Sequence, residues 1–211
     1  MIPKKNNFSN NPKDYRPISV TSCLGKLCEK LILDKLSDFL ESNNLIIKQQ
    51  SGFRKARQTK DNLAYLIQKV RESFNRKKKV LGLFFDIQSA FDRVWHNGLI
   101  FKMIQLKIPP QIISWIFDFL QNRTFSVKIN EIFSSKYPIT AGVPQGAVLS
   151  PILFSIFIND IPKTESKNKS NSLLFSDDLA SFFIFRSFNT IKKTVNSYLK
   201  NIEIWLSKWR L

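Results

Sequence analysis

The stretch Ser172–Phe185, SLLFSDDLASFFIF, places two adjacent aspartates among apolar residues. The apolar flanks predict two strands, and a hairpin between them would put Asp177 and Asp178 at its tip. Aspartate is a common turn residue, so the stretch taken alone favours a polar tip without a chemical role. Neighbouring side chains on a strand point to opposite faces, so both acids can serve one site only if the chain turns here.

A third aspartate follows another apolar run. Val80–Phe85, VLGLFF, suits a buried strand and is followed directly by Asp86. If this strand neighbours the hairpin, three carboxylates meet at one edge of a sheet. Unit charges about 4 Å apart repel by roughly 4 kcal/mol at an effective dielectric near 20, so the cluster needs protons or bridging cations. Carboxylates suit Mg²⁺, and two such ions can promote phosphoryl transfer.

The charge of the chain predicts a polyanionic partner. The 211 residues include 33 Lys and Arg against 16 Asp and Glu, a formal charge of +17. Nucleic acid is favoured over a membrane, because no apolar run approaches the roughly 18 residues of a membrane span and no signal peptide opens the chain.

Cys23 and Cys28 form neither a disulfide framework nor a zinc site, which indicates an intracellular location and no disulfide-linked partner. His96 is the only histidine, which nearly excludes a histidine base.

The order of periodic segments predicts an α+β fold, an antiparallel sheet with helices packed on one face. Helical periods cover about 24–40, 61–74, 97–106, 110–121, 151–158 and 190–208, and strand signals cover 80–85, 125–128, 136–140 and the hairpin. One loop of this predicted fold is a candidate ligand-binding segment. Gly142–Pro151, GVPQGAVLSP, lies before a helix, so its backbone can approach a ligand and Gln145 can project an amide. An ordinary turn with a helix cap is the alternative interpretation.

Five segments resemble, in order, the motifs of reverse transcriptases of the non-LTR retrotransposon family, the jockey-like and long interspersed elements. FFDIQSAFDRV at 84–94 resembles motif A, AGVPQGAVLSPILFSIFINDIP at 141–162 motif B, and LLFSDDLA at 173–180 motif C. DYRPISVTSCLGKLCEKLI at 14–32 and QQSGFRKARQTKDNL at 49–63 are similar to the two finger motifs. The resemblance implies a right-hand polymerase with fingers in 1–79 and a palm in 80–211 that ends before a thumb.

The resemblance also implies roles for individual residues. Asp86, Asp177 and Asp178 would be catalytic and would bind two Mg²⁺ ions, or Mn²⁺, with the backbone carbonyl of Ile87. The nucleotide-binding residues would be Arg16 on the triphosphate, Phe91 as a steric gate against a ribose 2′-OH, and Gln145 with Gly146. Lys4, Lys5 and Arg54 would contact nucleic acid. Ser176 stands where the family usually has alanine.

The implied function is RNA-directed DNA polymerase, which joins a dNTP to the 3′-OH of a DNA primer on an RNA template. The family acts in the nucleus, although no targeting signal is identified. The alternative is a truncated, inactive remnant that retains only nucleic-acid binding, because the chain stops at Leu211. A group II intron maturase is a weaker alternative, and the Asn-Asp-Ile-Pro ending of motif B argues against it. Template preference, target site and oligomeric state do not follow from the sequence.

Overall fold

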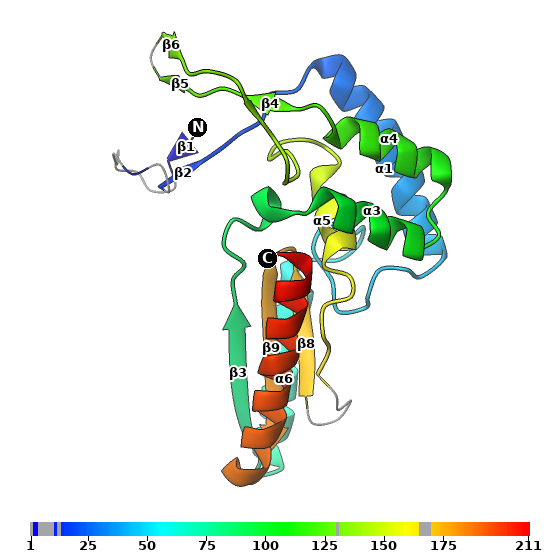
Figure 1. Cartoon of the computed structure of the whole chain (residues 1–211). Coiled ribbons are helices and arrows are strands. Elements are labelled where there is room, and N and C mark those ends of the chain that lie inside the picture. Colours follow the sequence, from blue (N-terminus) through cyan, green and yellow to red (C-terminus); the bar gives the residue numbers. More distant parts are fainter. Residues whose placement is uncertain (1, 4–10, 12–13, 130, 165–169) are drawn as a thin grey trace. The chain divides into compact units, whose positions relative to one another are not determined.

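The computed structural model describes the chain except residues 1, 4–10, 12–13, 130 and 165–169 (Figure 1). The helices are α1 (Cys23–Ser42), α2 (Thr59–Asn75), η2 (Ala90–Arg93, a 3-10 helix), α3 (His96–Gln105), α4 (Pro110–Leu120), α5 (Ser150–Phe157) and α6 (Phe188–Trp209). The strands are β1 (Ile2–Pro3), β2 (Tyr15–Arg16), β3 (Lys79–Phe85), β4 (Thr124–Phe125), β5 (Lys128–Ile129), β6 (Ile132–Phe133), β7 (Tyr137–Pro138), β8 (Ser170–Phe175) and β9 (Asp178–Phe185). The predicted α+β class is confirmed.

The chain forms two compact units that interleave along the sequence. Unit 1 comprises Met1–Asn43 and Phe91–Phe154, and unit 2 comprises Asn44–Ala90 and Ser155–Leu211. These units do not coincide with the predicted division at residue 79, and the labels fingers and palm stay a prediction. No helix in the described part of the chain is long and apolar enough to cross a membrane.

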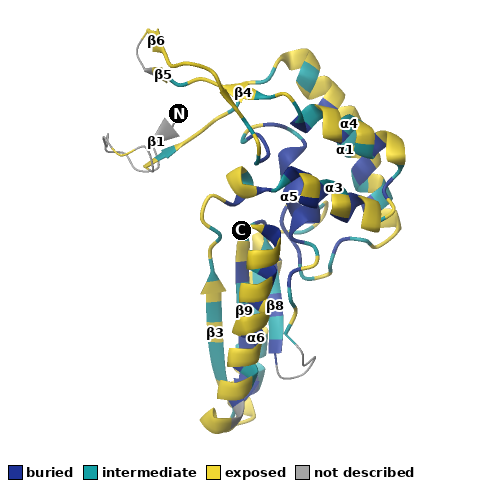
Figure 2. Ribbon diagram, viewed as in Figure 1, coloured by how far each residue is buried: buried dark blue, intermediate teal, exposed yellow. Residues whose placement is uncertain are grey.

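Unit 2 is built on an antiparallel sheet in the order β3-β9-β8 (Figure 1). Successive side chains of β9 alternate between its faces. On one face the Ser181 hydroxyl lies 2.7 Å from the Tyr198 hydroxyl of α6, and on the other the Phe182 ring meets Tyr65 of α2 at 6.3 Å between centroids. Helices therefore cover both faces of this sheet, rather than the single face that was predicted. This arrangement explains why β9 is buried over most of its length (Figure 2).

Unit 1 contains α1, α3 and α4 with three two-stranded ladders, β1-β2, β4-β7 and β5-β6. Local chemistry sets where two of its helices begin. Ser22 caps α1 because its hydroxyl accepts a hydrogen bond from the Gly25 amide at 3.0 Å, and Pro110 occupies the first turn of α4. The core of this unit includes Leu36, Leu99 and Ile116, whose side chains are fully buried. The strands predicted at 125–128 and 136–140 form the β4-β7 ladder and part of β5.

Candidate active site

Asp86, Asp177 and Asp178 lie at the same edge of the unit 2 sheet. The last pair between β3 and β9 joins Phe85 to Leu179, so Asp86 leaves its strand next to Asp178. Asp177 occupies the turn between β8 and β9, whose last pair joins Phe175 to Asp178. β3 is therefore a neighbour of the β8-β9 hairpin, which is the condition stated above for three carboxylates at one edge.

The turn itself is tight. Only Ser176 and Asp177 separate the paired ends of β8 and β9, and Ser176 has a φ of +58°. A positive φ at the first loop residue gives the turn a twist that matches the twist of the flanking strands. The predicted turn at Ser176 and Asp177 is thus confirmed.

Electrostatic repulsion acts within this acidic edge. Desolvation raises the pKa of the Asp178 carboxyl, and the charges of Asp177 and Asp86 raise it further. A set of carboxylate oxygens that repel one another fits a hard divalent cation such as Mg²⁺. Across the described residues, however, no three His, Cys, Asp or Glu side chains already stand close enough to hold a metal. Metal binding by these acids and by the Ile87 carbonyl stays a prediction.

A glutamine that was not singled out from the sequence supports the acidic turn. Gln50 is 1% exposed, and its Nε2 donates to the Ser176 carbonyl at 3.3 Å while its Oε1 accepts from the Ser176 amide at 3.1 Å. Gly52 lies so close that a Cβ there would stand 2.4 Å from the Ser176 nitrogen. The QQSGFR segment therefore packs directly against the turn that carries Asp177. The signal in the sequence was the Gln-x-Gly pattern of this segment.

In unit 1, the loop that carries Gln145 packs against the segment after β2. The Ser19 amide donates to the Gln145 carbonyl at 2.8 Å. Gly146 has a φ of +105°, and a Cβ there would lie 3.1 Å from the Ser19 carbonyl oxygen. A cavity of about 780 Å³ opens here, lined by residues 17–21, 92, 123–128, 139 and 141–145. The predicted approach of a glycine-containing loop to a ligand-sized space is consistent with this geometry.

The same loop also packs against the end of motif A. The Gln145 side chain donates to the Asp92 carboxylate at 2.8 Å. Gly142 has a φ of +90°, and a Cβ there would lie 2.8 Å from the Asp92 carbonyl oxygen. His96 is buried, and its Nε2 lies 2.8 Å from the Gly142 carbonyl. The single histidine of the chain therefore contacts the backbone of this loop.

A buried glutamate supports the next part of this loop. The Glu29 carboxylate is 2% exposed and accepts hydrogen bonds from the Val148 amide at 2.7 Å and the Leu149 amide at 3.1 Å. These amides come immediately before α5, where backbone N–H groups lack helical partners. Glu29, which belongs to α1, thus holds the backbone of this loop through two hydrogen bonds. No pattern in the sequence indicated this contact.

The other predicted site residues occupy varied settings. Phe91 is half-buried and stacks on Phe154 with 4.9 Å between ring centroids. Arg16 is exposed in β2, and Arg54 donates to the Ile47 and Gln50 carbonyls at 3.3 Å each. Arg54 therefore helps to hold the QQSGFR segment, and its contact with nucleic acid stays a prediction. The predicted residues Lys4 and Lys5 lie outside the described part of the chain.

The family model for reverse transcriptase (RNA-dependent DNA polymerase) matches residues 2–211. The chain belongs to the reverse transcriptase family. It is 36% identical over 216 residues to the RNA-directed DNA polymerase from mobile element jockey of Drosophila melanogaster, covering all of this chain and 24% of that protein. It is 33% identical to the probable RNA-directed DNA polymerase from transposon BS of the same species, with the same coverage. The chain thus spans about a quarter of the length of these relatives.

Solved structures resemble the fold of this chain. Apo telomerase from Candida tropicalis matches with a TM-score of 0.62 at 14% identity, over 87% of this chain and 35% of that one. The same enzyme truncated from its C-terminal domain matches with a TM-score of 0.61 at 17% identity, over 88% of this chain and 38% of that one. The expected right-hand polymerase fold is confirmed by these matches.

Proposed function

We propose that the chain is the catalytic core of an RNA-directed DNA polymerase that extends a DNA primer on an RNA template. The observation that carries the proposal is the convergence of Asp86, Asp177 and Asp178 at one sheet edge, where desolvation and then the charges of the other two acids raise the pKa of Asp178. Membership of the reverse transcriptase family and a charge of +17 support a nucleic-acid substrate.

The three aspartates supply the ligands for two divalent cations. Asp86 and Asp177 bind them most directly, Asp178 completes the cluster, and the Ile87 carbonyl adds an oxygen. When bound, two such ions activate the attacking hydroxyl and stabilise the leaving oxygen in phosphoryl transfer. The residues themselves provide a strand end and a tight turn, which bring the three aspartates to the same edge of the sheet.

Four further residues of the chain bind the incoming dNTP in this proposal. Gln145 and Gly146 contact the nucleotide, and the Arg16 guanidinium binds phosphate oxygens because its planar fork matches their geometry. Phe91 blocks a ribose 2′-OH. Its stacking on Phe154 restricts the ring, which supports a steric role. Lys4, Lys5 and Arg54 contact the nucleic-acid backbone.

Primer extension tests the proposal. The purified chain is expected to synthesise cDNA from primed RNA with Mg²⁺ or Mn²⁺, and Asp177→Asn is expected to abolish synthesis while the far-ultraviolet circular dichroism spectrum stays unchanged. Phe91→Val is expected to admit ribonucleotides, whereas unchanged sugar selectivity would refute the gate. RNA binding without any synthesis under either metal would instead favour an inactive nucleic-acid-binding remnant.

A further inference from the structure

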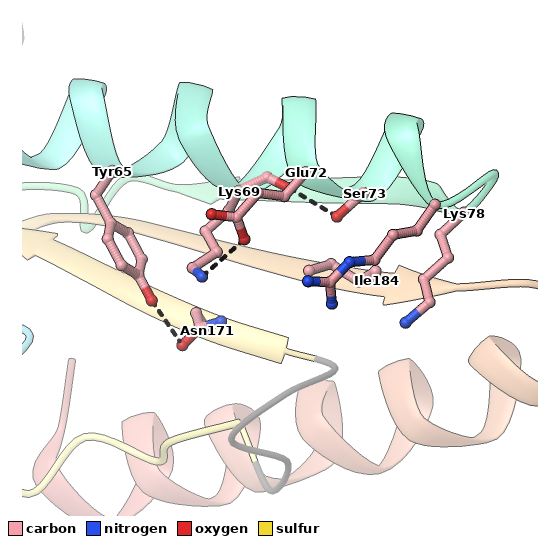
Figure 3. Close-up of a pocket in the computed structure, with 8 residues that line it drawn as sticks. Tyr65, Lys69, Glu72, Ser73, Lys78, Asn171 and Ile184 are labelled. Atoms are coloured by element: carbon pink, nitrogen blue, oxygen red, sulfur yellow. Dashed lines mark hydrogen bonds and ion pairs between the residues drawn. The ribbon is translucent and has the colours of Figure 1, made fainter.

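Helix α2 presents polar side chains to the sheet, and a cavity lies between them. The cavity has a volume of about 460 Å³, and Figure 3 shows Tyr65, Lys69 and Ser73 of α2 on one side of it. Asn171 of β8 and Ile184 of β9 lie on the other side. A helix that covers a sheet ordinarily turns its apolar side inward. A polar interior of this size is therefore better suited to a ligand than to a core.

The apolar side of α2 confirms this orientation. Leu63, Ile67 and Phe74 recur at helical spacing and are 56%, 44% and 60% exposed. Ser73, on the side that faces the sheet, is 3% exposed, and its hydroxyl donates to the Lys69 carbonyl at 2.7 Å. The helix thus buries Ser73 while these three apolar side chains stay exposed, and Leu66 and Val70 are half-buried.

Positive charge exceeds negative charge around this cavity. Lys69, Arg76 and Lys78 line it with one carboxylate, Glu72. Lys69 Nζ lies 3.0 Å from Glu72 Oε2, and this contact, with hydrogen bonding from Gln68, lowers the Glu72 pKa. Glu72 is therefore charged at neutral pH and offsets one cation. An excess of two positive charges remains, which favours a ligand with at least two anionic groups.

The lining also includes an aromatic surface. Tyr65 is 37% exposed, its hydroxyl donates to Asn171 Oδ1 at 3.3 Å, and Lys69 Nζ lies 5.7 Å from its ring centroid. A basic groove with an accessible ring is the combination that binds single-stranded nucleic acid, because phosphates meet the cations and an unpaired base stacks on the ring. A duplex presents its phosphates but not the faces of its bases.

The cavity and the acidic edge lie at opposite ends of the same sheet. Lys78 precedes the first residue of β3 and Asp86 follows the last, and seven strand residues span about 23 Å. We propose that this cavity, between Tyr65, Arg76 and Lys78, is a second binding site for single-stranded nucleic acid, separate from the catalytic aspartates. The proposal rests on the nucleic-acid substrate proposed above, and it assigns a site that primer extension alone does not test.

Fluorescence anisotropy with a labelled oligouridine of about 12 nucleotides tests the site, because single-strand binders occupy about 4–16 nucleotides. The double variant Arg76→Gln/Lys78→Gln removes the excess charge and keeps the Lys69–Glu72 pair. Its matched control is Lys192→Gln/Lys193→Gln, which removes the same charge from exposed positions on α6 of the same unit. Urea unfolding of each variant establishes that the fold is retained.

In the cavity variant, the slope of log affinity against log salt concentration is expected to decrease in magnitude by about 1.4. Each single-strand phosphate contact contributes about 0.7 to this slope, and the variant removes two cations. The control is expected to keep the wild-type slope. Tyr65→Leu is expected to weaken oligouridine binding about tenfold and to leave binding of a blunt duplex unchanged. Oligodeoxythymidine measured in parallel distinguishes RNA from DNA as the ligand.

Equal slopes for the two double variants would overturn the proposal, because binding would then depend on total charge alone. Unchanged oligouridine affinity in Tyr65→Leu would overturn the stacking role and with it the site. Loss of binding to phosphatidylserine vesicles without loss of oligouridine binding would assign the cavity to a membrane surface instead. Failure of the wild-type chain in primer extension would count against the proposed function, and the anisotropy result would still stand.

Discussion

Gln50 and Ser176 lie 126 residues apart in the chain, and the Gln50 side chain contacts both polar groups of the Ser176 backbone. Its Nε2 donates to the Ser176 carbonyl at 3.3 Å, and its Oε1 accepts from the Ser176 amide at 3.1 Å. Oε1 also accepts from the Gly52 amide at 2.8 Å, so both polar atoms of the Gln50 side chain have hydrogen-bond partners. The backbone beside Asp177 is therefore held from outside its own hairpin.

Replacing Gln50 by alanine is expected to slow catalysis through the position of the acidic turn. The Ser176 amide and carbonyl would lose a buried partner, and a misplacement of about 1 Å at a catalytic group can cost about 100-fold in rate. We expect kcat for primer extension to fall about 10- to 100-fold, the Mg²⁺ concentration for half-maximal rate to rise, and KM for dNTP to stay near wild type.

Asn62→Ala provides the matched control for Gln50→Ala. Asn62 Nδ2 donates to the Leu174 carbonyl at 3.2 Å, so the control removes a hydrogen bond to the same hairpin away from its turn. It is expected to reduce stability with little change in the Mg²⁺ requirement. An identical loss of kcat in both variants would mean that Gln50 acts only on stability.

Ser176→Ala is expected to stabilise the chain. The Ser176 hydroxyl is buried and has no hydrogen-bond partner among the described residues. An unsatisfied buried polar group costs about 1–3 kcal/mol, so the free energy of unfolding in urea should rise by about 1 kcal/mol. Ser181→Ala is the control, because its hydroxyl lies 2.7 Å from the Tyr198 hydroxyl, and this change should destabilise. A loss of stability in Ser176→Ala would show that the hydroxyl is satisfied.

The arrangement of the acids was largely predictable from the sequence, because it follows from local patterns. The run ending at Asp86 and the hairpin around Asp177 carry strand signals of their own, and only their pairing had to be assumed. The Gln50 contact was not predictable, because it joins distant segments through one side chain and one turn. Its nearest signal was the Gly52 position, where the backbone permits no Cβ.

Helix α2 shows a second limit of periodicity. Its period correctly predicted a helix and placed Leu63, Leu66, Ile67, Val70 and Phe74 on one face. Leu63, Ile67 and Phe74 are exposed, whereas Leu66 and Val70 are half-buried. An amphipathic pattern identifies which residues share a face, and it contains no information on what covers that face. The polar cavity beneath α2 could therefore be recognised only in the folded chain.

Asp178→Asn is expected to stabilise the chain at neutral pH and not in acid. The pKa of Asp178 is raised in the folded state by desolvation and by Asp177 and Asp86, so the folded state binds more protons than the unfolded one between the two pKa values. Stability therefore falls as pH rises from the unfolded pKa, about 3.9, through the folded one, and stays lower above it. Asp178→Asn has no carboxyl at this position and therefore lacks this loss of stability as the pH rises.

Urea midpoints at pH 7 and at about pH 3.5, with and without Mg²⁺, check this prediction. Mg²⁺ should raise the wild-type midpoint at pH 7 more than that of the variant, since the ion relieves the repulsion. Asp118→Asn, an exposed position on α4, is the control and should shift neither midpoint. A neutral-pH midpoint for Asp178→Asn no higher than wild type would contradict the repulsion.

Glu29 is expected to be the most costly single acid to remove from unit 1. Its carboxylate accepts from the Val148 and Leu149 amides at the start of α5, and its charge also acts on Arg123, whose pKa is lowered by burial and raised by Glu29. Glu29→Ala should lower the free energy of unfolding by about 3 kcal/mol, because two amides lose a charged acceptor in a buried site. Glu29→Gln keeps an acceptor oxygen and should cost less. Asp34→Ala, exposed on α1, removes the same charge and should have little effect; equal losses at both positions would mean that charge, rather than the loop contact, sets the cost.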